Sequence, residues 1–282
     1  MFQLKTILFP VDFSEACKAA AEQVAATAAH FGAELLLFHV VQMQPVWYGD
    51  AVGYSAVVDM DEVIDTKRLA LSEVLRDRDD LEIRRLVACG DPAQAILECA
   101  RKEAVDLIMM PSRGCGPFRR FLLGSVTAKV LHDVDCPVWT DTHQQHFEPR
   151  ESCRSILCAV DLSQAMVPAL QWAAEFSRSE EADLRLVHAV PWYEDGHGEA
   201  ASLRHVVDDA RNTIAGLEER AGVQAPVSIK PGSVAEVLRE AALKYAANMI
   251  VIGQGSLHKL MGRLRTSAYA IIREAPCPVV RV

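Results

Sequence analysis

The sequence has no long apolar run at its start and no excess of basic residues. Its first fourteen residues, MFQLKTILFPVDFS, are apolar only briefly and then carry Asp12, so they match neither a signal peptide nor a membrane span of about 20 residues. The net charge is −9, whereas a protein that binds a phosphate backbone needs clustered Lys and Arg. We therefore expect a cytoplasmic protein that binds neither nucleic acid nor a membrane.

Thiol and metal motifs are also scarce. Eight cysteines in 282 residues are too sparse for a disulfide framework, and many lie in apolar runs, as Cys158 does, so we expect reduced thiols. No CxxC pair occurs. His143 and His146 have only Glu148 and Cys153 as further candidate ligands, and the spacing is not that of a zinc site. We expect a solvated linker there and no metal site.

What the sequence does contain is an internal repeat. Residues 5–14, KTILFPVDFS, reappear as RSILCAVDLS at 154–163, and His39 reappears as His188 with the same offset of 149 residues. Three later pairs keep the same order along the chain: Gly90 with Gly232, Met110 with Ile252, and Cys136 with Cys277. We predict two copies of one domain, at 1–140 and 154–282, joined by a linker at 141–153.

Each copy alternates short apolar runs with longer amphipathic segments, a pattern typical of βαβ units that feed a parallel sheet. In the first copy the pattern predicts strands near 4–9, 34–41, 82–88, 106–110 and 137–140, and helices near 14–31, 57–78, 92–103 and 121–132. In the second copy it predicts strands near 155–160, 183–190, 226–230, 248–252 and 278–282. Ser14 and Ser163 stand where a helix N-cap belongs, and Pro92 suits a first helical turn after Asp91.

Ligands of an open parallel sheet bind beyond the carboxyl ends of its strands, which directs attention to the loops there. Asp12 follows the first strand, where a carboxylate can accept from a ribose hydroxyl or an adenine amino group; alternatively, it only favours the start of the next helix. The loop after the fourth strand ends in Gly124 and Ser125, a small-residue helix start that suits an anion. It is not a Walker A loop. His39 and His188 end their strands and are expected to be hydrogen-bonded there rather than catalytic.

These motifs together resemble the universal stress protein family in its tandem-domain form. The resemblance rests on Val-Asp12-x-Ser, Gly90-Asp-Pro, the loop from Ser112 to Ser125, and the closing Cys-Pro-Val, and it covers nearly the whole chain. It implies an α/β fold with two tandem flavodoxin-like or Rossmann-like domains. Each would have a five-stranded parallel sheet in the order 3-2-1-4-5, flanked by helices.

Many members of that family bind ATP through a Gly-x-x-Gly-x9-Gly-Ser/Thr motif. In the first copy the resemblance implies a nucleotide site formed by Pro10, Asp12, Val40, Met110, Ser112, Arg113, Gly114, Gly124, Ser125 and Val126. Pro111 replaces the first motif glycine, which removes a backbone N–H and so one ribose or phosphate contact.

In the second copy the corresponding site is formed by Asp161, Ala189, Gly253, Ser256 and Ser267. Ser256 and Thr266 replace two of its motif glycines, and a β-branched residue narrows the approach to the backbone. We therefore expect ATP in the first copy, with Mg²⁺ only where ATP is bound, and no catalytic residues.

Three functions stay open at this point. The chain is a nucleotide-binding stress regulator, a slow ATPase or self-phosphorylating protein, or a scaffold that binds no nucleotide. The resemblance also implies that the last strands of the two copies pair within the chain, and it leaves open a homodimer of whole chains.

Overall fold

A computed structural model of the chain describes residues 2–42, 59–112, 123–141, 153–190, 200–254 and 265–282. Contacts among these residues divide the chain into two units. The N-terminal unit holds the described residues of 4–112 and 124–136. The C-terminal unit holds residues 2–3, 123 and the described residues of 137–282.

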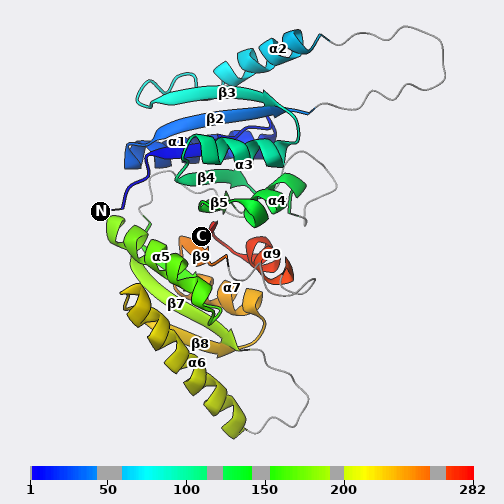
Figure 1. Cartoon of the computed structure of the whole chain (residues 1–282). Coiled ribbons are helices and arrows are strands. Elements are labelled where there is room, and N and C mark those ends of the chain that lie inside the picture. The colour runs from blue at the N-terminus through cyan, green and yellow to red at the C-terminus, as the bar shows by residue number, and fades with distance from the viewer. Residues whose placement is uncertain (1, 43–58, 113–122, 142–152, 191–199, 255–264) are drawn as a thin grey trace, which may run out of the picture. The chain divides into compact units, whose positions relative to one another are not determined.

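The N-terminal unit is a parallel sheet flanked by helices (Figure 1). Its strands are β1 (Thr6–Pro10), β2 (Glu34–Val41), β3 (Ile83–Cys89) and β4 (Leu107–Pro111), in the order β3-β2-β1-β4. Its helices are α1 (Glu15–Phe31), α2 (Met60–Ser72), α3 (Pro92–Lys102) and α4 (Ser125–Asp133). Strands β1, β2 and β4 are near-continuous apolar runs, and residues such as Ile7, Leu8 and Leu36 are fully buried, as expected for strands covered on both faces.

The C-terminal unit repeats this plan. Its strands are β5 (Val138–Asp141), β6 (Ser155–Ala159), β7 (Asp183–Val190), β8 (Val227–Pro231), β9 (Met249–Ile252) and β10 (Val279–Arg281). Its helices are α5 (Val167–Ser179), α6 (Ala200–Ala221), α7 (Val234–Lys244) and α9 (Arg265–Glu274), with a 3₁₀ turn, η1 (Gln164–Met166), before α5. The strand order is β5-β10-β9-β6-β7-β8. Numbered within the second copy, the strands β8, β7, β6, β9 and β10 are parallel and lie in the order 3-2-1-4-5. The predicted fold class is confirmed.

Strand β5 comes from the first copy but belongs by its contacts to the C-terminal unit. It runs antiparallel to β10, with Trp139 opposite Val280, and the Thr140 hydroxyl donates to the Val279 carbonyl over 3.1 Å. This is the pairing of last strands that the family resemblance implies.

The start of the chain also belongs to the C-terminal unit. The ring of Phe2 meets those of Trp172 and Phe176 edge-on, with centroids 5.6 and 5.4 Å away. Phe176 in turn stacks on Trp172 at 5.0 Å and lies 6.3 Å from Trp139 of β5. Both ends of the first copy thus contribute side chains to one aromatic cluster.

Helix starts follow the predicted caps in the N-terminal unit. The Ser14 hydroxyl accepts from the Cys17 backbone N–H over 3.1 Å, and the Asp91 carboxylate accepts from Gln94 N–H, with Pro92 in the first turn. Gly90 before that cap has φ +136°, a value that only glycine adopts easily, and Gly232 repeats it at +139°.

Ser163 takes the predicted N-cap position, with φ −82° and ψ 155°, but its side chain makes no capping bond and the helix begins with a 3₁₀ turn. The Met166 N–H, which corresponds to that of Cys17, donates to the Ser163 carbonyl over 3.1 Å and forms the 3₁₀ turn η1 instead. The Ser163 hydroxyl makes no capping bond, and its oxygen is buried without a hydrogen-bond partner in the described part of the chain. The regular helix α5 therefore begins only at Val167.

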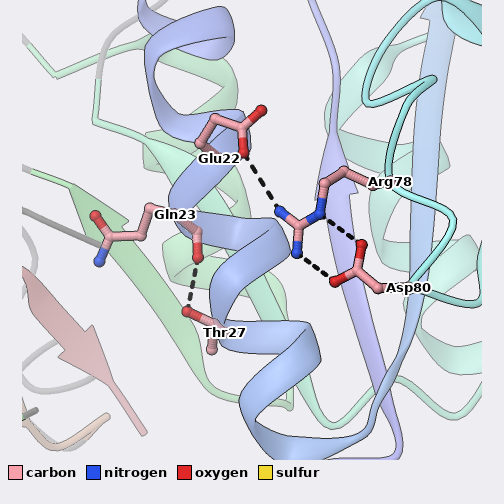
Figure 2. A network of polar contacts seen from close by, with 5 residues as sticks. All are labelled: Glu22, Gln23, Thr27, Arg78 and Asp80. Carbon is pink, nitrogen blue, oxygen red and sulfur yellow. Dashed lines mark hydrogen bonds and ion pairs between the residues drawn. The ribbon is translucent and has the colours of Figure 1, made fainter. Parts of the chain in front are cut away.

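Helix α2 ends at Ser72, earlier than the predicted residue 78. The guanidinium of Arg85 on β3 donates to the Leu71 and Val74 carbonyls over 3.1 and 2.9 Å. It thus supplies hydrogen-bond donors for carbonyl groups at the end of the helix. The chain beyond is held to α1, because Arg78 bonds both Asp80 carboxylate oxygens at 2.8 Å and contacts Glu22 at 3.3 Å (Figure 2).

Helix α4 likewise begins later than predicted, at Ser125 rather than 121, and residues 121–122 lie outside the described residues. In the described parts of both units, no helix combines the length and the apolar character that crossing a membrane requires.

Candidate functional site

The loop after the first strand, β1 in one copy and β6 in the other, has the same backbone form in both copies. The Asp12 carboxylate accepts from the Ser14 N–H over 2.9 Å, and the Asp161 carboxylate accepts from the Ser163 N–H over 2.9 Å. The residue between them is left-handed in each copy, with φ +60° at Phe13 and +63° at Leu162. A large side chain in this region stores backbone strain of about 1–3 kcal/mol, and such strain concentrates at functional sites. Asp12 is exposed at the end of this turn.

A histidine from the second strand supports each of these loops. His39 Nδ1 lies 2.7 Å from the Val11 carbonyl oxygen, and His188 Nδ1 lies 2.7 Å from that of Val160. Since a carbonyl only accepts, Nδ1 carries the proton in both rings. The expectation of hydrogen-bonded strand-end histidines is confirmed.

The surroundings of His39 lower the pKa of its ring and so favour the neutral form. Burial is the main cause that lowers its pKa from 6.5, with a smaller contribution from the nearby Lys67 cation, while the Val11 carbonyl and Asp12 oppose the shift. The Phe13 ring is tilted by 49° against the His39 ring with centroids 4.6 Å apart, and the Lys67 ammonium lies 5.3 Å from the Phe13 centroid. In the first copy, a cation and two rings therefore lie beside the loop that carries Asp12.

The loop after β4 is closed at its base. The Gly124 N–H donates to the Ser112 carbonyl over 2.9 Å, so the two ends of a long connection meet. The Thr127 hydroxyl donates to the Pro111 carbonyl over 3.1 Å and fixes α4 to the end of β4. Met110 and Ser112 are buried. Arg113 and Gly114, two further candidate residues, lie outside the described residues.

The beginning of α4 therefore lies at the carboxyl end of β4. Gly124 is the N-cap, with φ −60° and ψ 139°, and no side chain of the described residues makes a capping hydrogen bond there. The N–H groups of Ser125 and Val126 have no carbonyl within the helix to donate to, and an exposed Ser125 adds a hydroxyl. This is the geometry in which helix starts bind phosphate or carboxylate.

The carboxyl ends of β1, β2 and β4 form one edge of the sheet. β1 pairs with β2 on one side and β4 on the other, and Val11 N–H extends the first pairing by donating to Phe38 over 2.8 Å. The candidate residues Pro10, Asp12, Val40 and Gly124 all follow or end these strands. The topology thus brings them to the place where open α/β sheets bind ligands.

The second copy differs at the end of its fourth strand. Gly253 follows β9 and is buried, and a Cβ added there would lie 2.5 Å from the Met166 sulfur. Ala189 is also buried. Ser256 lies outside the described residues, and Ser267 is described only by its backbone in α9. Met166 was not among the residues predicted from the sequence. The repeat offered one indication, since Met166 is larger than Cys17 at the corresponding position of the first copy.

Two repeated doubly wound α/β domains, each with an aspartate turn after its first strand, define the class of protein. A sequence model of the universal stress protein family matches residues 3–140 and again residues 153–282. The chain therefore belongs to the universal stress protein family and contains two of its domains.

Individual relatives agree with this assignment. The universal stress protein in the QAH/OAS sulfhydrylase 3′ region of Thermus aquaticus is 35% identical over 137 residues, which are 48% of this chain and 96% of that protein. A universal stress protein from Archaeoglobus fulgidus DSM 4304 has a TM-score of 0.69 at 24% identity and covers 99% of this chain, with 96% of its own length matched. A putative universal stress protein from Pseudomonas aeruginosa UCBPP-PA14 has a TM-score of 0.63 at 16% identity, covers 99% of this chain and is itself covered over 93%. These two structures show that the fold is shared over the whole chain.

Proposed function

We propose that this universal stress protein binds an adenine nucleotide, ATP, in its N-terminal copy and acts as a regulatory or sensor module in the cytoplasm. The observation that carries the proposal is the contact between Gly124 and Ser112 over 2.9 Å. It holds the start of α4 at the carboxyl end of β4, the strand next to β1, whose loop carries Asp12. Only the first copy combines this turn with matches to the second and third motif glycines, Gly114 and Gly124.

Each group has a chemical role in this proposal. The N–H groups at the start of α4 and the Ser125 hydroxyl bind phosphate oxygens, assisted by Arg113 and the backbone at Gly114. Asp12 accepts a hydrogen bond from the ribose or the adenine amino group, and Val40 contacts the base. Mg²⁺ enters only with ATP, because this ion is usually held largely by substrate phosphates and water.

The most direct test of this function is to identify any small molecule that stays bound to the protein during purification. Heat release followed by mass spectrometry is expected to find an adenine nucleotide, and its absence from protein that also fails to bind added ATP favours the scaffold. Phosphate release then separates the regulator from the slow ATPase, since the regulator returns ATP unchanged.

The substitution Gly124→Val tests where the nucleotide binds. The Cβ branches would stand where phosphate approaches the α4 N–H groups, so we expect ATP affinity to fall roughly tenfold or more, equivalent to about 1.4 kcal/mol. The backbone there, φ −60° and ψ 139°, suits valine, so the melting temperature should change little.

Gly216→Ala is the matched control, because nothing lies within 4 Å of a Cβ at that position on α6. It should bind ATP like the parent chain. If Gly124→Val also binds ATP as tightly as the parent, the pocket lies elsewhere.

A further inference from the structure

The first turn of α4 is tied to the end of β4 through two consecutive carbonyl groups. The Gly124 N–H donates to the Ser112 carbonyl over 2.9 Å. The Thr127 hydroxyl donates to the Pro111 carbonyl over 3.1 Å, and Thr127 is buried, with 4% of its surface exposed. The start of the helix is thus fixed to the strand by one backbone donor and one side-chain donor.

The side-chain bond belongs to the same turn as the amide groups proposed to meet phosphate. The first hydrogen bond inside α4 runs from the Ala128 N–H to the Gly124 carbonyl over 2.8 Å. The three preceding N–H groups, those of Ser125, Val126 and Thr127, thus have no carbonyl within the helix to donate to. Backbone amides that bind a ligand need a supporting contact that fixes their position, because hydrogen bonds weaken when distance and angle change. The Thr127 hydroxyl supplies such a contact within the turn itself.

The second copy lacks this contact. Tyr269 on α9 stands at the position of Thr127, and Gly253 stands at that of Pro111, both with an offset of 142 residues. The tyrosine hydroxyl is at the far end of a ring, and no hydrogen bond joins it to Gly253 among the described residues. The two copies therefore differ in how the helix after the fourth strand is attached to that strand.

We propose that Thr127 is a positioning residue of the nucleotide site in the N-terminal copy. Its hydroxyl keeps the first turn of α4 at the end of β4, so that the N–H groups of Ser125 and Val126 stay placed for a phosphate group. This inference rests on the proposed function and adds a residue that lies outside the Gly-x-x-Gly-x9-Gly-Ser/Thr motif.

Replacing Thr127 with valine tests the hydroxyl. Valine keeps the β-branched shape of threonine but donates no hydrogen bond, so the Pro111 carbonyl loses its side-chain donor. We expect ATP affinity to fall by roughly fivefold or more, the effect of about one lost hydrogen bond. Calorimetry well below the melting temperature measures this affinity while the protein stays folded. Thr127→Ser keeps the hydroxyl and should bind ATP within about twofold of the parent.

Thr27→Val is the matched control. The Thr27 hydroxyl donates to the Gln23 carbonyl over 2.9 Å within α1, so the same substitution removes the same kind of bond in the same unit (Figure 2). Its ATP affinity should equal that of the parent. Unchanged affinity in Thr127→Val, or an equal loss in Thr127→Ser or Thr27→Val, would overturn the proposal.

Hydrogen exchange without any ligand separates this inference from the proposed function. The Gly124 N–H should exchange faster in Thr127→Val than in the parent, because its bond to Ser112 depends on the same placement of α4. Unchanged exchange at Gly124 would overturn the positioning role of Thr127. If exchange changes as expected but the parent chain binds no ATP, the proposed function is what fails.

Discussion

At the scale of single residues, His39 links the stability of the first copy to pH. Its Nδ1–H donates to the Val11 carbonyl, and burial lowers its pKa below 6.5. The folded state thus binds fewer protons than the unfolded state between the lowered pKa and 6.5. Stability is therefore fully present above about pH 6.5 and decreases as the pH falls from there toward the folded pKa.

Replacing His39 with asparagine should remove this pH dependence. An asparagine amide keeps a donor near the position of Nδ1 but does not titrate, so it preserves the bond to Val11. We expect the melting temperature of His39→Asn to fall less steeply than that of the parent below about pH 6.5. Melting curves recorded across this range for both proteins measure the difference. Identical slopes would mean that another group is responsible.

At the scale of elements, the two copies begin their first helices differently despite the shared Val-Asp-x-Ser sequence. Ser14 completes a side-chain cap on α1, whereas Ser163 precedes a 3₁₀ turn and its hydroxyl accepts no cap bond. The likeness ends at the serine: the second copy has Pro168, which has no N–H to donate to the Gln164 carbonyl, and its regular helix begins only at Val167.

The matched substitutions Ser14→Ala and Ser163→Ala should therefore differ in cost. Loss of a serine N-cap typically costs about 1 kcal/mol, so Ser14→Ala should lower the free energy of unfolding by about that amount. Ser163→Ala removes a buried hydroxyl that has no partner among the described residues and should be neutral or slightly stabilising. Urea unfolding of both variants measures the two costs. A larger loss at Ser163 would show that its hydroxyl does cap the helix.

Element ends show how far the sequence could predict the fold. The strands lie within about two residues of their predicted positions, because buried apolar runs and turn residues mark them locally. The end of α2 could not be predicted, since Arg85 reaches it from a different strand. The caps at Ser14 and Asp91 were predictable because all their partners lie within three residues.

The candidate site also has features that the sequence predicts and features that depend on contacts between distant residues. The positions of Asp12 and Gly124 at the edge of the sheet follow from strand order, which the repeat and the family resemblance imply. The relation between Met166 and Gly253 joins residues far apart in sequence, and no local pattern reveals it.

At the scale of the whole molecule, the units defined by contacts do not coincide with the sequence repeats. Residues 2–3 and strand β5 come from the first repeat, yet they belong to the C-terminal unit. Phe2 contributes two edge-on ring contacts there, and β5 contributes the buried Trp139. The second repeat alone would leave part of its aromatic cluster and the edge of β10 exposed.

Phe2→Ala should consequently destabilise the C-terminal unit. Two aromatic contacts at about 0.5–1.5 kcal/mol each, made by a half-buried ring, suggest a loss of about 1–2 kcal/mol. Urea unfolding followed by tryptophan fluorescence reports on Trp139 and Trp172, which lie in the cluster. Leu69→Ala, at an exposed position on α2, is the control and should be neutral. An unchanged unfolding curve for Phe2→Ala would show that the start of the chain does not stabilise this unit.

The most direct measurement is a calorimetric titration of the full chain with ATP in the presence of Mg²⁺. One nucleotide site per chain, lost in Gly124→Val and kept in Gly216→Ala, is the predicted result. No heat at all would contradict nucleotide binding, and a site kept in Gly124→Val would contradict its place at the start of α4.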